Sequence, residues 1–222
     1  MAVYAIGDIH GCLGTLEALL DRIGPGADDH LVFVGDYIDR GPDSRGVLAR
    51  MIALRDAAAS GAGPACTFIR GNHDQMLLDW VDEVPGAFDL WRPNGGLTTL
   101  DSYPEGRVQP EHVAFLRETE LAVIVGGAAY VHAGLDPARP VREQVERPDP
   151  EVALWTRAHL RADLSRWEMP VVCGHTPVLE PLATRALVAI DTGAVYHHRE
   201  GLGRLTAARM PEAEFVQVPY QG

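Results

Sequence analysis

Six short apolar segments of strand length, each followed by the same kind of polar turn, limit what this chain can fold into. The first three end in Gly-Asp or Gly-Asn-His, at residues 2–11 (AVYAIGDIHG), 31–41 (LVFVGDYIDRG) and 66–74 (CTFIRGNHD). The later three carry His-Ala-Gly, Gly-His and Asp-Thr-Gly, at residues 122–134, 170–177 and 186–198. Continuous apolar strands are typical of sheets that are covered on both faces, so we expect a layered α/β protein.

Helical patterns separate the first three strands. Residues 13–23 carry leucines at helical spacing, and residues 43–59 begin with Asp43 or Ser44 as the N-cap. The order strand–helix–strand–helix–strand predicts βαβ units and a parallel sheet. In the second half, a Gly-Gly pair at 126–127 predicts a hairpin turn, so we expect a second, mixed sheet packed on the first.

The length of the chain fits one domain. With 222 residues, of which 46% are hydrophobic, it can bury a large core without disulfides or structural zinc. We expect a single domain over residues 1–222. Residues 81–107 are dense in Gly, Pro, Asn and Asp, so they are predicted to form a helical or loop insertion at the rim. Residues 136–150 hold four prolines and are predicted to form a second exposed loop.

Composition and charge exclude several classes of protein. The formal net charge is −12 and the arginines are scattered among acidic residues, so we expect no face that binds duplex nucleic acid. No apolar run approaches the roughly 18 residues of a membrane span, and no signal peptide is recognisable. The three cysteines, Cys12, Cys66 and Cys173, lack CxxC spacing, which indicates free thiols. We expect a cytoplasmic protein with no membrane contact and no obligate partner.

The polar residues at the strand ends share one kind of chemistry. Ligands of α/β sheets bind beyond the carboxyl ends of the strands, and the side chains collected there are Asp8, His10, Asp36, Asn72, His73, His132 and His175. Carboxylate oxygen and imidazole nitrogen suit divalent Mn, Fe, Zn, Co or Ni. Seven groups are more than one metal needs, and a carboxylate can bridge two ions roughly 3.5–4 Å apart. The set therefore predicts a dinuclear metal centre.

The order of these motifs resembles a known family. GDIHG (7–11), GDYIDRG (35–41), RGNHD (70–74), HAG (132–134) and GHT (174–176) resemble the signature of the phosphoprotein-phosphatase branch of the calcineurin-like metallophosphoesterases. Within that branch, RGNHDQML, WRPNGG, LWTR and GHTP are most similar to the bacterial and phage-lambda-type serine/threonine protein phosphatases. The resemblance implies an α/β fold in which two mixed β-sheets form a sandwich flanked by helices.

The resemblance also implies that six residues bind two divalent ions, with manganese expected before iron, zinc, cobalt or nickel. Asp8 and His10 would hold one ion, and Asn72, His132 and His175 would hold the other. Asp36 would bridge the two ions. Two cations lower the pKa of a shared water toward neutrality, which gives a hydroxide nucleophile.

Five further residues take roles by the same resemblance. His73 would be the general acid that protonates the leaving alkoxide, and Asp39 would hydrogen-bond it. Arg40 and, through LWTR, Arg157 would bind the phosphate oxygens, and Arg70 would line the same pocket.

The substrate class stays open between two hypotheses. The first is a phosphate monoester, either on a protein at phosphoserine, phosphothreonine or phosphotyrosine, or in a small phosphoester. The second is a nucleotide pyrophosphate, as in the symmetrical diadenosine tetraphosphatases. Arg70 and the Asn-Gly-Gly at 94–96 favour the first, whereas Asp74 favours the second, because the protein-phosphatase branch usually has Glu after Gly-Asn-His. A non-catalytic binding protein is a third hypothesis, against which the completeness of the motif residues speaks.

Other residues give weaker signals. The Asp-Thr-Gly at Asp191 resembles an aspartic-protease motif, but a single copy here predicts a strand-end turn near the site. Trp91 and Tyr103 are candidates for the rim of the pocket, where they would stack on a substrate ring. Trp80 fits an amphipathic helix, so we expect it to pack.

Overall fold

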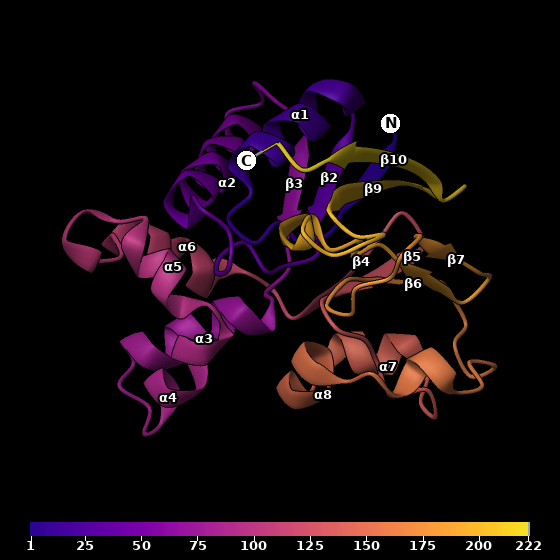
Figure 1. Ribbon diagram of the computed structural model, residues 1–222. Helices are drawn as coiled ribbons and strands as arrows, with labels where there is room; N and C mark the ends of the chain where they lie inside the picture. The colour runs from indigo at the N-terminus through magenta and orange to yellow at the C-terminus, as the bar shows by residue number, and fades with distance from the viewer. Residues whose placement is uncertain (222) are drawn as a thin grey trace.

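The computed structural model describes residues 1–221 and contains two five-stranded β-sheets packed face to face (Figure 1). The first sheet has the strand order β10-β9-β1-β2-β3. Strands β1, β2 and β3 are parallel and β9 runs antiparallel to β1, so the sheet is mixed. Its strands are β1 Val3–Ile6, β2 His30–Phe33, β3 Ala65–Phe68, β9 Arg204–Met210 and β10 Glu214–Pro219.

The second sheet has the order β4-β5-β6-β8-β7. A hairpin joins β4 to β5, after which β5, β6 and β8 run parallel and β7 pairs antiparallel with β8. Its strands are β4 Ala122–Val125, β5 Ala128–Val131, β6 Val171–Cys173, β7 Leu182–Ala183 and β8 Leu187–Ala189.

Helices cover the outer faces of both sheets (Figure 1). The first sheet is covered by α1 Leu13–Ile23 and α2 Ser44–Ala59, and the second by α7 Val141–Glu146 and α8 Pro150–Trp155. A lobe beside the sheets contains α3 Asn72–Val81, α4 Ala87–Trp91, α5 Gly96–Asp101 and α6 Pro110–Glu118. Four short 3-10 helices complete the description: η1 Arg92–Asn94, η2 Pro104–Gly106, η3 Ala158–Arg161 and η4 Ala194–Tyr196.

The alternation of side chains along the strands produces three apolar layers. Val3 and Ala5 of β1 point into the layer between the sheets, whereas Tyr4 and Ile6 face the layer under the helices of the first sheet. A third layer joins the outer face of the second sheet to α7 and α8, with Val141 among its buried members. Burial on both faces explains why the strands are apolar along their whole length.

Several local predictions are confirmed by the structure. Helix α1 covers the predicted residues, and α2 begins after Asp43, whose carboxylate accepts a 2.7 Å hydrogen bond from the backbone N–H of Gly46. Both glycines of the predicted hairpin have positive φ, 57° for Gly126 and 85° for Gly127, as a tight hairpin turn requires.

Two predictions about the second half are corrected. Strands β9 and β10 were not expected, because the run at 204–210 mixes polar with small apolar residues and carries no ligand motif. They return to the first sheet and make it mixed. Residues 141–146, expected in an exposed loop, form α7, because Val141 is buried in the layer under the second sheet.

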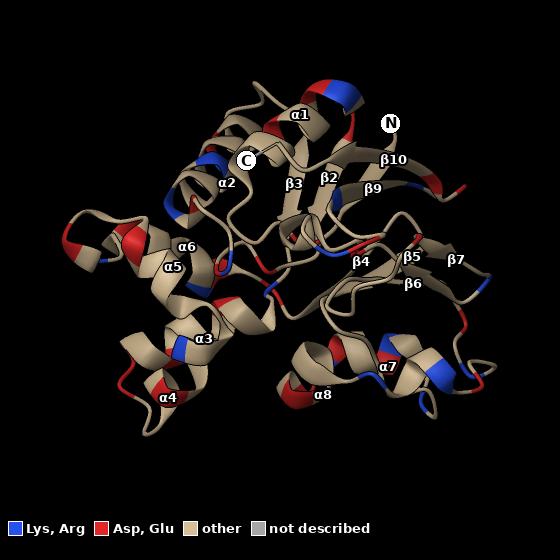
Figure 2. Cartoon of the chain, viewed as in Figure 1, with Lys and Arg blue, Asp and Glu red and all other residues tan. Residues whose placement is uncertain are grey.

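Acidic and basic residues gather at the centre of the molecule as well as on the outer helices. Figure 2 shows both colours in the loops where the ends of the strands of the two sheets meet. Within residues 1–221, no helix has the length and apolar character needed to cross a membrane.

Candidate metal centre

The first sheet delivers three of the predicted ligands. Asp8 and His10 follow β1, Asp36 follows β2, and all three side chains are buried. The Nδ1 of His10 lies 2.8 Å from the carbonyl oxygen of Ile38, so its N–H donates there. The Nε2 therefore presents a lone pair toward the Asp36 carboxylate, 3.4 Å away.

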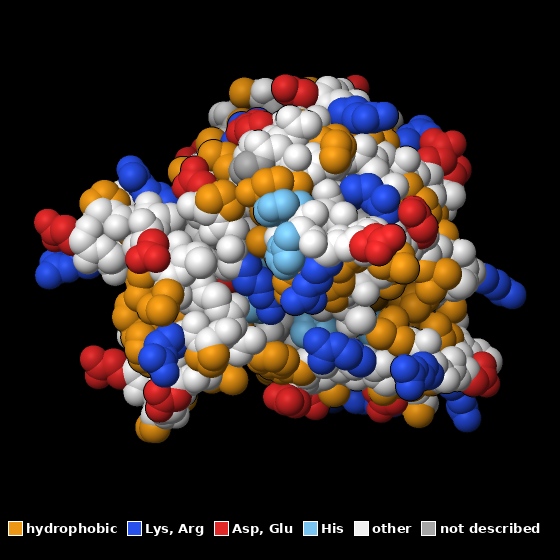
Figure 3. Space-filling model, in the orientation of Figure 1, with side chains coloured by type: hydrophobic (Ala, Val, Ile, Leu, Met, Phe, Trp, Pro, Cys, Tyr) orange, Lys and Arg blue, Asp and Glu red, His pale blue; other side chains and the backbone are white. Residues whose placement is uncertain are grey.

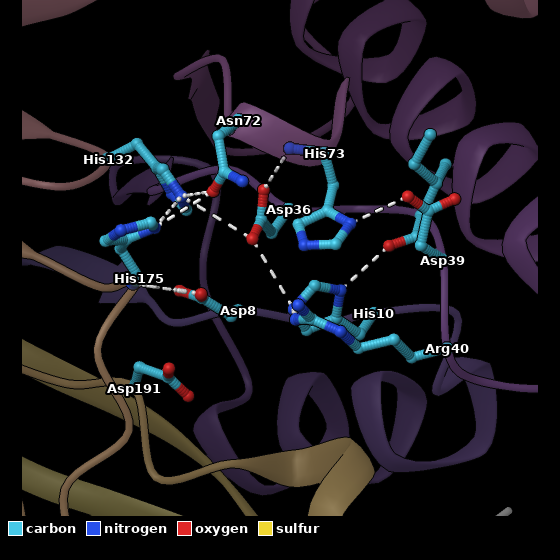
Figure 4. A network of polar contacts seen from close by, with 12 residues as sticks. Asp8, His10, Asp36, Asp39, Arg40, Asn72, His73, His132, His175 and Asp191 are labelled. Atoms are coloured by element: carbon cyan, nitrogen blue, oxygen red, sulfur yellow. Dashed lines mark hydrogen bonds and ion pairs between the residues drawn. The ribbon is translucent and has the colours of Figure 1, made fainter. Parts of the chain in front are cut away.

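The helix α3 and the second sheet deliver the other three ligands. Asn72 is the first residue of α3, His132 follows β5, and His175 follows β6. The Oδ1 of Asn72 lies 2.9 Å from both His132 Nε2 and His175 Nδ1, and those two nitrogens are 3.2 Å apart. Figure 4 shows these three side chains converging with Asp36 and Asp8 on one point.

The chemistry of these atoms fits a divalent metal. His132 donates through Nδ1 to the carbonyl oxygen of Val34 at 2.9 Å, so its neutral ring offers only a lone pair to the Asn72 oxygen. Two acceptors in contact are stabilised by a shared cation, and ligands held roughly 2.0–2.2 Å from a first-row metal come this close to one another. Burial lowers the pKa of His132 and lowers the pKa of His175 to about 3, which keeps both rings neutral for coordination.

Three buried carboxylates beside these ligands are stabilised only if positive charge lies close to them. Burial raises the pKa of Asp8, and the charges of Asp191 and Asp36 raise it further. Burial also raises the pKa of Asp191 to about 7. For Asp36, burial alone would raise the pKa, but the surrounding imidazoles in their protonated form, His132 first, bring it below its ordinary value. Buried like charges without cations are unfavourable, so the carboxylates also fit divalent ions.

The predicted general acid sits beside the ligands with its partner. The Nδ1 of His73 lies 2.7 Å from Asp39 Oδ2, and both residues are buried. The Asp39 carboxylate also accepts hydrogen bonds from Trp91 Nε1 at 2.8 Å and Thr99 Oγ1 at 2.6 Å. With Nδ1 occupied, the Nε2 of His73 is the atom available to a substrate in the pocket that His73 lines.

Part of the insertion at 81–107 packs behind the site, while its Asn94 lines the pocket. Trp91 on α4 is fully buried, which corrects the expectation that it stacks on a substrate. Tyr103 is buried too, and its hydroxyl lies 2.6 Å from His112 Nδ1. Trp80 packs as predicted, with its ring 5.0 Å from that of Trp91. Trp91 begins the WRPNGG motif, but neither it nor Thr99 is a metal ligand or an acid by residue type, so no sequence signal linked either to Asp39.

Two of the three predicted arginines reach the pocket and the third does not. Arg40 and Arg157 line a cavity of about 150 Å³ together with Asp36, Asn72, His73 and His175. The Nη1 of Arg40 lies 2.6 Å from His10 Nε2. Arg70 is a correction: its guanidinium donates to Thr119 Oγ1, to Gln75 Oε1 and to the carbonyl oxygens of Arg117 and Thr119. These contacts hold it between α3 and the end of α6.

Asp74, which favoured the nucleotide-pyrophosphate hypothesis in the sequence, supports the backbone of the site in the structure. Its carboxylate accepts backbone hydrogen bonds from Asp36 at 2.9 Å, Tyr37 at 3.2 Å and Gly71 at 2.8 Å. The side chain is fully buried and does not line the pocket. Residue 74 therefore positions Asp36 and does not contact a substrate.

Close packing explains two of the motif glycines. A Cβ on Gly174 would lie 1.9 Å from Asp8 Oδ1, and one on Gly71 would lie 2.1 Å from Asp36 Oδ1. Both distances are impossible for real atoms. The glycines beside the ligands therefore let two carboxylates approach the backbone of the neighbouring strand end.

Backbone strain is concentrated at the same place. Eight non-glycine residues of the described chain have positive φ, and five of them belong to the site, namely His10, Asp36, Asp39, Arg40 and His175. Such conformations cost of order 1–3 kcal/mol each and cluster at functional sites. The strain is a second, independent mark of function that the residue types alone do not reveal.

Comparison with known proteins places the chain in a family. The family model described as calcineurin-like phosphoesterase matches residues 1–201. The chain therefore belongs to the calcineurin-like phosphoesterases, a family of hydrolases that depend on two metal ions, and the fold and family predicted from the motifs are confirmed.

Named relatives carry two kinds of activity. Serine/threonine-protein phosphatase 1 of Salmonella typhimurium (strain LT2) is 34% identical over 94% of this chain and 91% of the relative. A symmetrical bis(5'-nucleosyl)-tetraphosphatase of Aromatoleum aromaticum (strain EbN1) is 38% identical over 66% of this chain, which spans 51% of that longer relative. A crystal structure of a protein described, provisionally, as a diadenosine tetraphosphatase has a TM-score of 0.70 at 26% identity, covering 100% of this chain and 94% of that one.

Proposed function

We propose that the protein is a phosphatase that hydrolyses phosphate monoesters on proteins, at phosphoserine or phosphothreonine, with phosphotyrosine as a further substrate. The observation that carries this proposal is the His73–Asp39 pair, which lies beside the six-ligand cluster in a pocket that also holds Arg40 and Arg157. The cavity of about 150 Å³ suits one phosphoryl group, and a relative that is matched over 91% of its length, by 94% of this chain, is a protein phosphatase.

The residues divide the reaction between them. Asp8, His10, Asp36, Asn72, His132 and His175 would hold two divalent ions, which when bound supply an activated water and a counter-charge for phosphate. Arg40 and Arg157 bind the phosphate oxygens through charge-assisted hydrogen bonds. His73, oriented by Asp39 through Nδ1, donates the Nε2 proton to the leaving oxygen of the alcohol.

We propose manganese as the resident metal. The carboxylate and amide oxygens of the ligand set suit manganese, and no thiolate is present in the set to favour a softer metal. Loss of activity on treatment with a chelator, followed by recovery that is greatest with Mn²⁺, is the expected result. Recovery that is greater with Zn²⁺ or Ni²⁺ would contradict the choice of manganese and leave the dinuclear centre intact.

A second candidate function is the hydrolysis of dinucleoside polyphosphates. The sequence relative from Aromatoleum aromaticum and the crystal structure at 26% identity support it. The same six ligands would serve both reactions, since both cleave a bond between phosphorus and oxygen.

A side-by-side turnover assay tests the proposal. The chain is incubated with Mn²⁺ and a phosphoserine peptide, a phosphotyrosine peptide or diadenosine tetraphosphate, and kcat/KM is compared. The proposal predicts the highest value for the phosphoserine peptide. A higher value for diadenosine tetraphosphate would favour the second candidate, and no turnover of any substrate would overturn both.

A further inference from the structure

A groove continues from the metal pocket along the surface of the protein. It has a volume of about 310 Å³ and is lined by Arg40, Asn94, Tyr196, His198 and Arg199, with Pro93, Gly95 and Val195 beside them. Arg40, Asn94 and Tyr196 also line the metal pocket, so the two hollows share a wall. We refer to the part lined by Tyr196, His198 and Arg199 as the outer groove.

The outer groove is cationic although the protein as a whole is strongly acidic. The guanidinium of Arg199 lies 4.5 Å from the centre of the Tyr196 ring, and that of Arg40 lies 5.6 Å from the same ring. In the described part of the chain, neither guanidinium pairs with a carboxylate; the arginines in ion pairs are Arg50, Arg55, Arg117, Arg139, Arg204 and Arg209. Figure 3 shows basic and histidine side chains gathered near the centre of the face that it displays.

The loop that carries the outer groove is held at its base. The backbone N–H of Gly203 donates to the carbonyl oxygen of Gly193 at 3.0 Å and closes the loop. The ring of His197 stacks on that of Tyr220 at 3.9 Å, while its neighbour His198 lines the groove. An anchored loop presents its side chains at lower entropic cost than a free one, so the position of Arg199 is a property of the fold.

We propose that the outer groove binds a second anionic group of the substrate, adjacent to the phosphate that is hydrolysed. Both guanidinium groups lie beside the Tyr196 ring with no carboxylate partner among residues 1–221, so an anionic group in the outer groove would meet Arg199 with no competing counter-charge and would accept charge-assisted hydrogen bonds from it. Asn94 and Tyr196 add polar groups beside them. The inference rests on the proposed phosphatase function and makes Arg199 a residue that determines specificity.

The second anion has two chemical sources, and paired substrates distinguish them. A phosphoserine peptide with acidic neighbours is compared with the same peptide with neutral neighbours. Diadenosine tetraphosphate is compared with p-nitrophenyl phosphate, which has one phosphate only. For wild type, Arg199→Ala and Arg199→Lys, the kcat/KM ratio is measured within each pair. Arg185→Ala, an equal change of charge outside both hollows, is the matched control.

Arg199→Ala is expected to lower the preference for the doubly anionic member of one pair by about tenfold, while Arg199→Lys restores part of it and Arg185→Ala changes nothing. The wild-type preference is expected to fall as salt is added, because exposed charges are screened. The affected pair identifies the source of the anion. Unchanged ratios, or an equal loss on every substrate, would overturn the inference alone. A wild type that turns over no phosphoester would overturn the proposed function and the inference with it.

Discussion

The floor of the metal pocket and the outer groove are built in opposite ways. On the floor, strand ends and the start of α3 deliver buried side chains. The Nδ1 of His10 and that of His132 each donate a hydrogen bond to a backbone carbonyl oxygen, which fixes the orientation of the ring. In the outer groove, a loop between β8 and β9 delivers exposed side chains such as Arg199, which contacts an aromatic ring. The rigid floor suits positions that must be correct to a fraction of an ångström. The exposed groove suits selection among substrates that share one reaction.

The largest expected effect lies at the centre of the floor. Asp36→Asn removes the charge that would bridge both ions, so we expect loss of bound metal and a fall in activity on the order of a thousandfold. Metal analysis after gel filtration measures the first effect and turnover of p-nitrophenyl phosphate the second. Asp28→Asn, at an exposed position, is the control for charge. Full metal occupancy in Asp36→Asn would contradict the bridging role.

The next-largest expected effect distinguishes loss of the general acid from loss of the bound metals. His73→Asn is expected to keep both ions but to lose about a hundredfold or more in kcat with a phosphoserine peptide, and much less with p-nitrophenyl phosphate. The reason is that nitrophenolate leaves without a proton, whereas a serine alkoxide needs one. Equal losses on the two substrates would show that His73 is not the general acid.

A smaller effect tests the support behind the acid. Trp91→Phe removes the indole N–H that bonds Asp39 but keeps an aromatic ring in the core. We expect about a tenfold loss of kcat with the phosphoserine peptide, since one hydrogen bond to a charged group is worth roughly 1.5–3 kcal/mol. Trp80→Phe is the matched control, because the Trp80 ring packs on Trp91 without bonding Asp39. Equal kinetics for the two variants would assign Trp91 to packing alone.

The comparison of floor and groove also explains what the sequence could predict. The ligands of the floor follow buried strands and have a narrow choice of chemistry, so their order alone located Asp8, Asp36 and His175. Trp91 and Arg199 depend on how the insertion and the last loop fold back on the site, and no local pattern specifies such contacts. Strand β9 was missed for a similar reason, because it pairs with β1 near the other end of the chain, and β10 joins the sheet only through β9.

The smallest expected effect on activity concerns Arg70. Its guanidinium makes four hydrogen bonds between α3 and the end of α6, away from the pocket. Arg70→Ala should therefore leave kcat/KM within about twofold of wild type, while it lowers the free energy of unfolding by about 1–3 kcal/mol. Arg157→Ala is the counterpart: Arg157 is exposed, makes no ion pair among residues 1–221 and lines the pocket. That variant should keep its stability and raise the KM for the phosphoserine peptide about tenfold. If Arg70→Ala instead raised KM without loss of stability, Arg70 would belong to the phosphate site, and the hydrogen bonds that hold it in this structure would have to open for substrate.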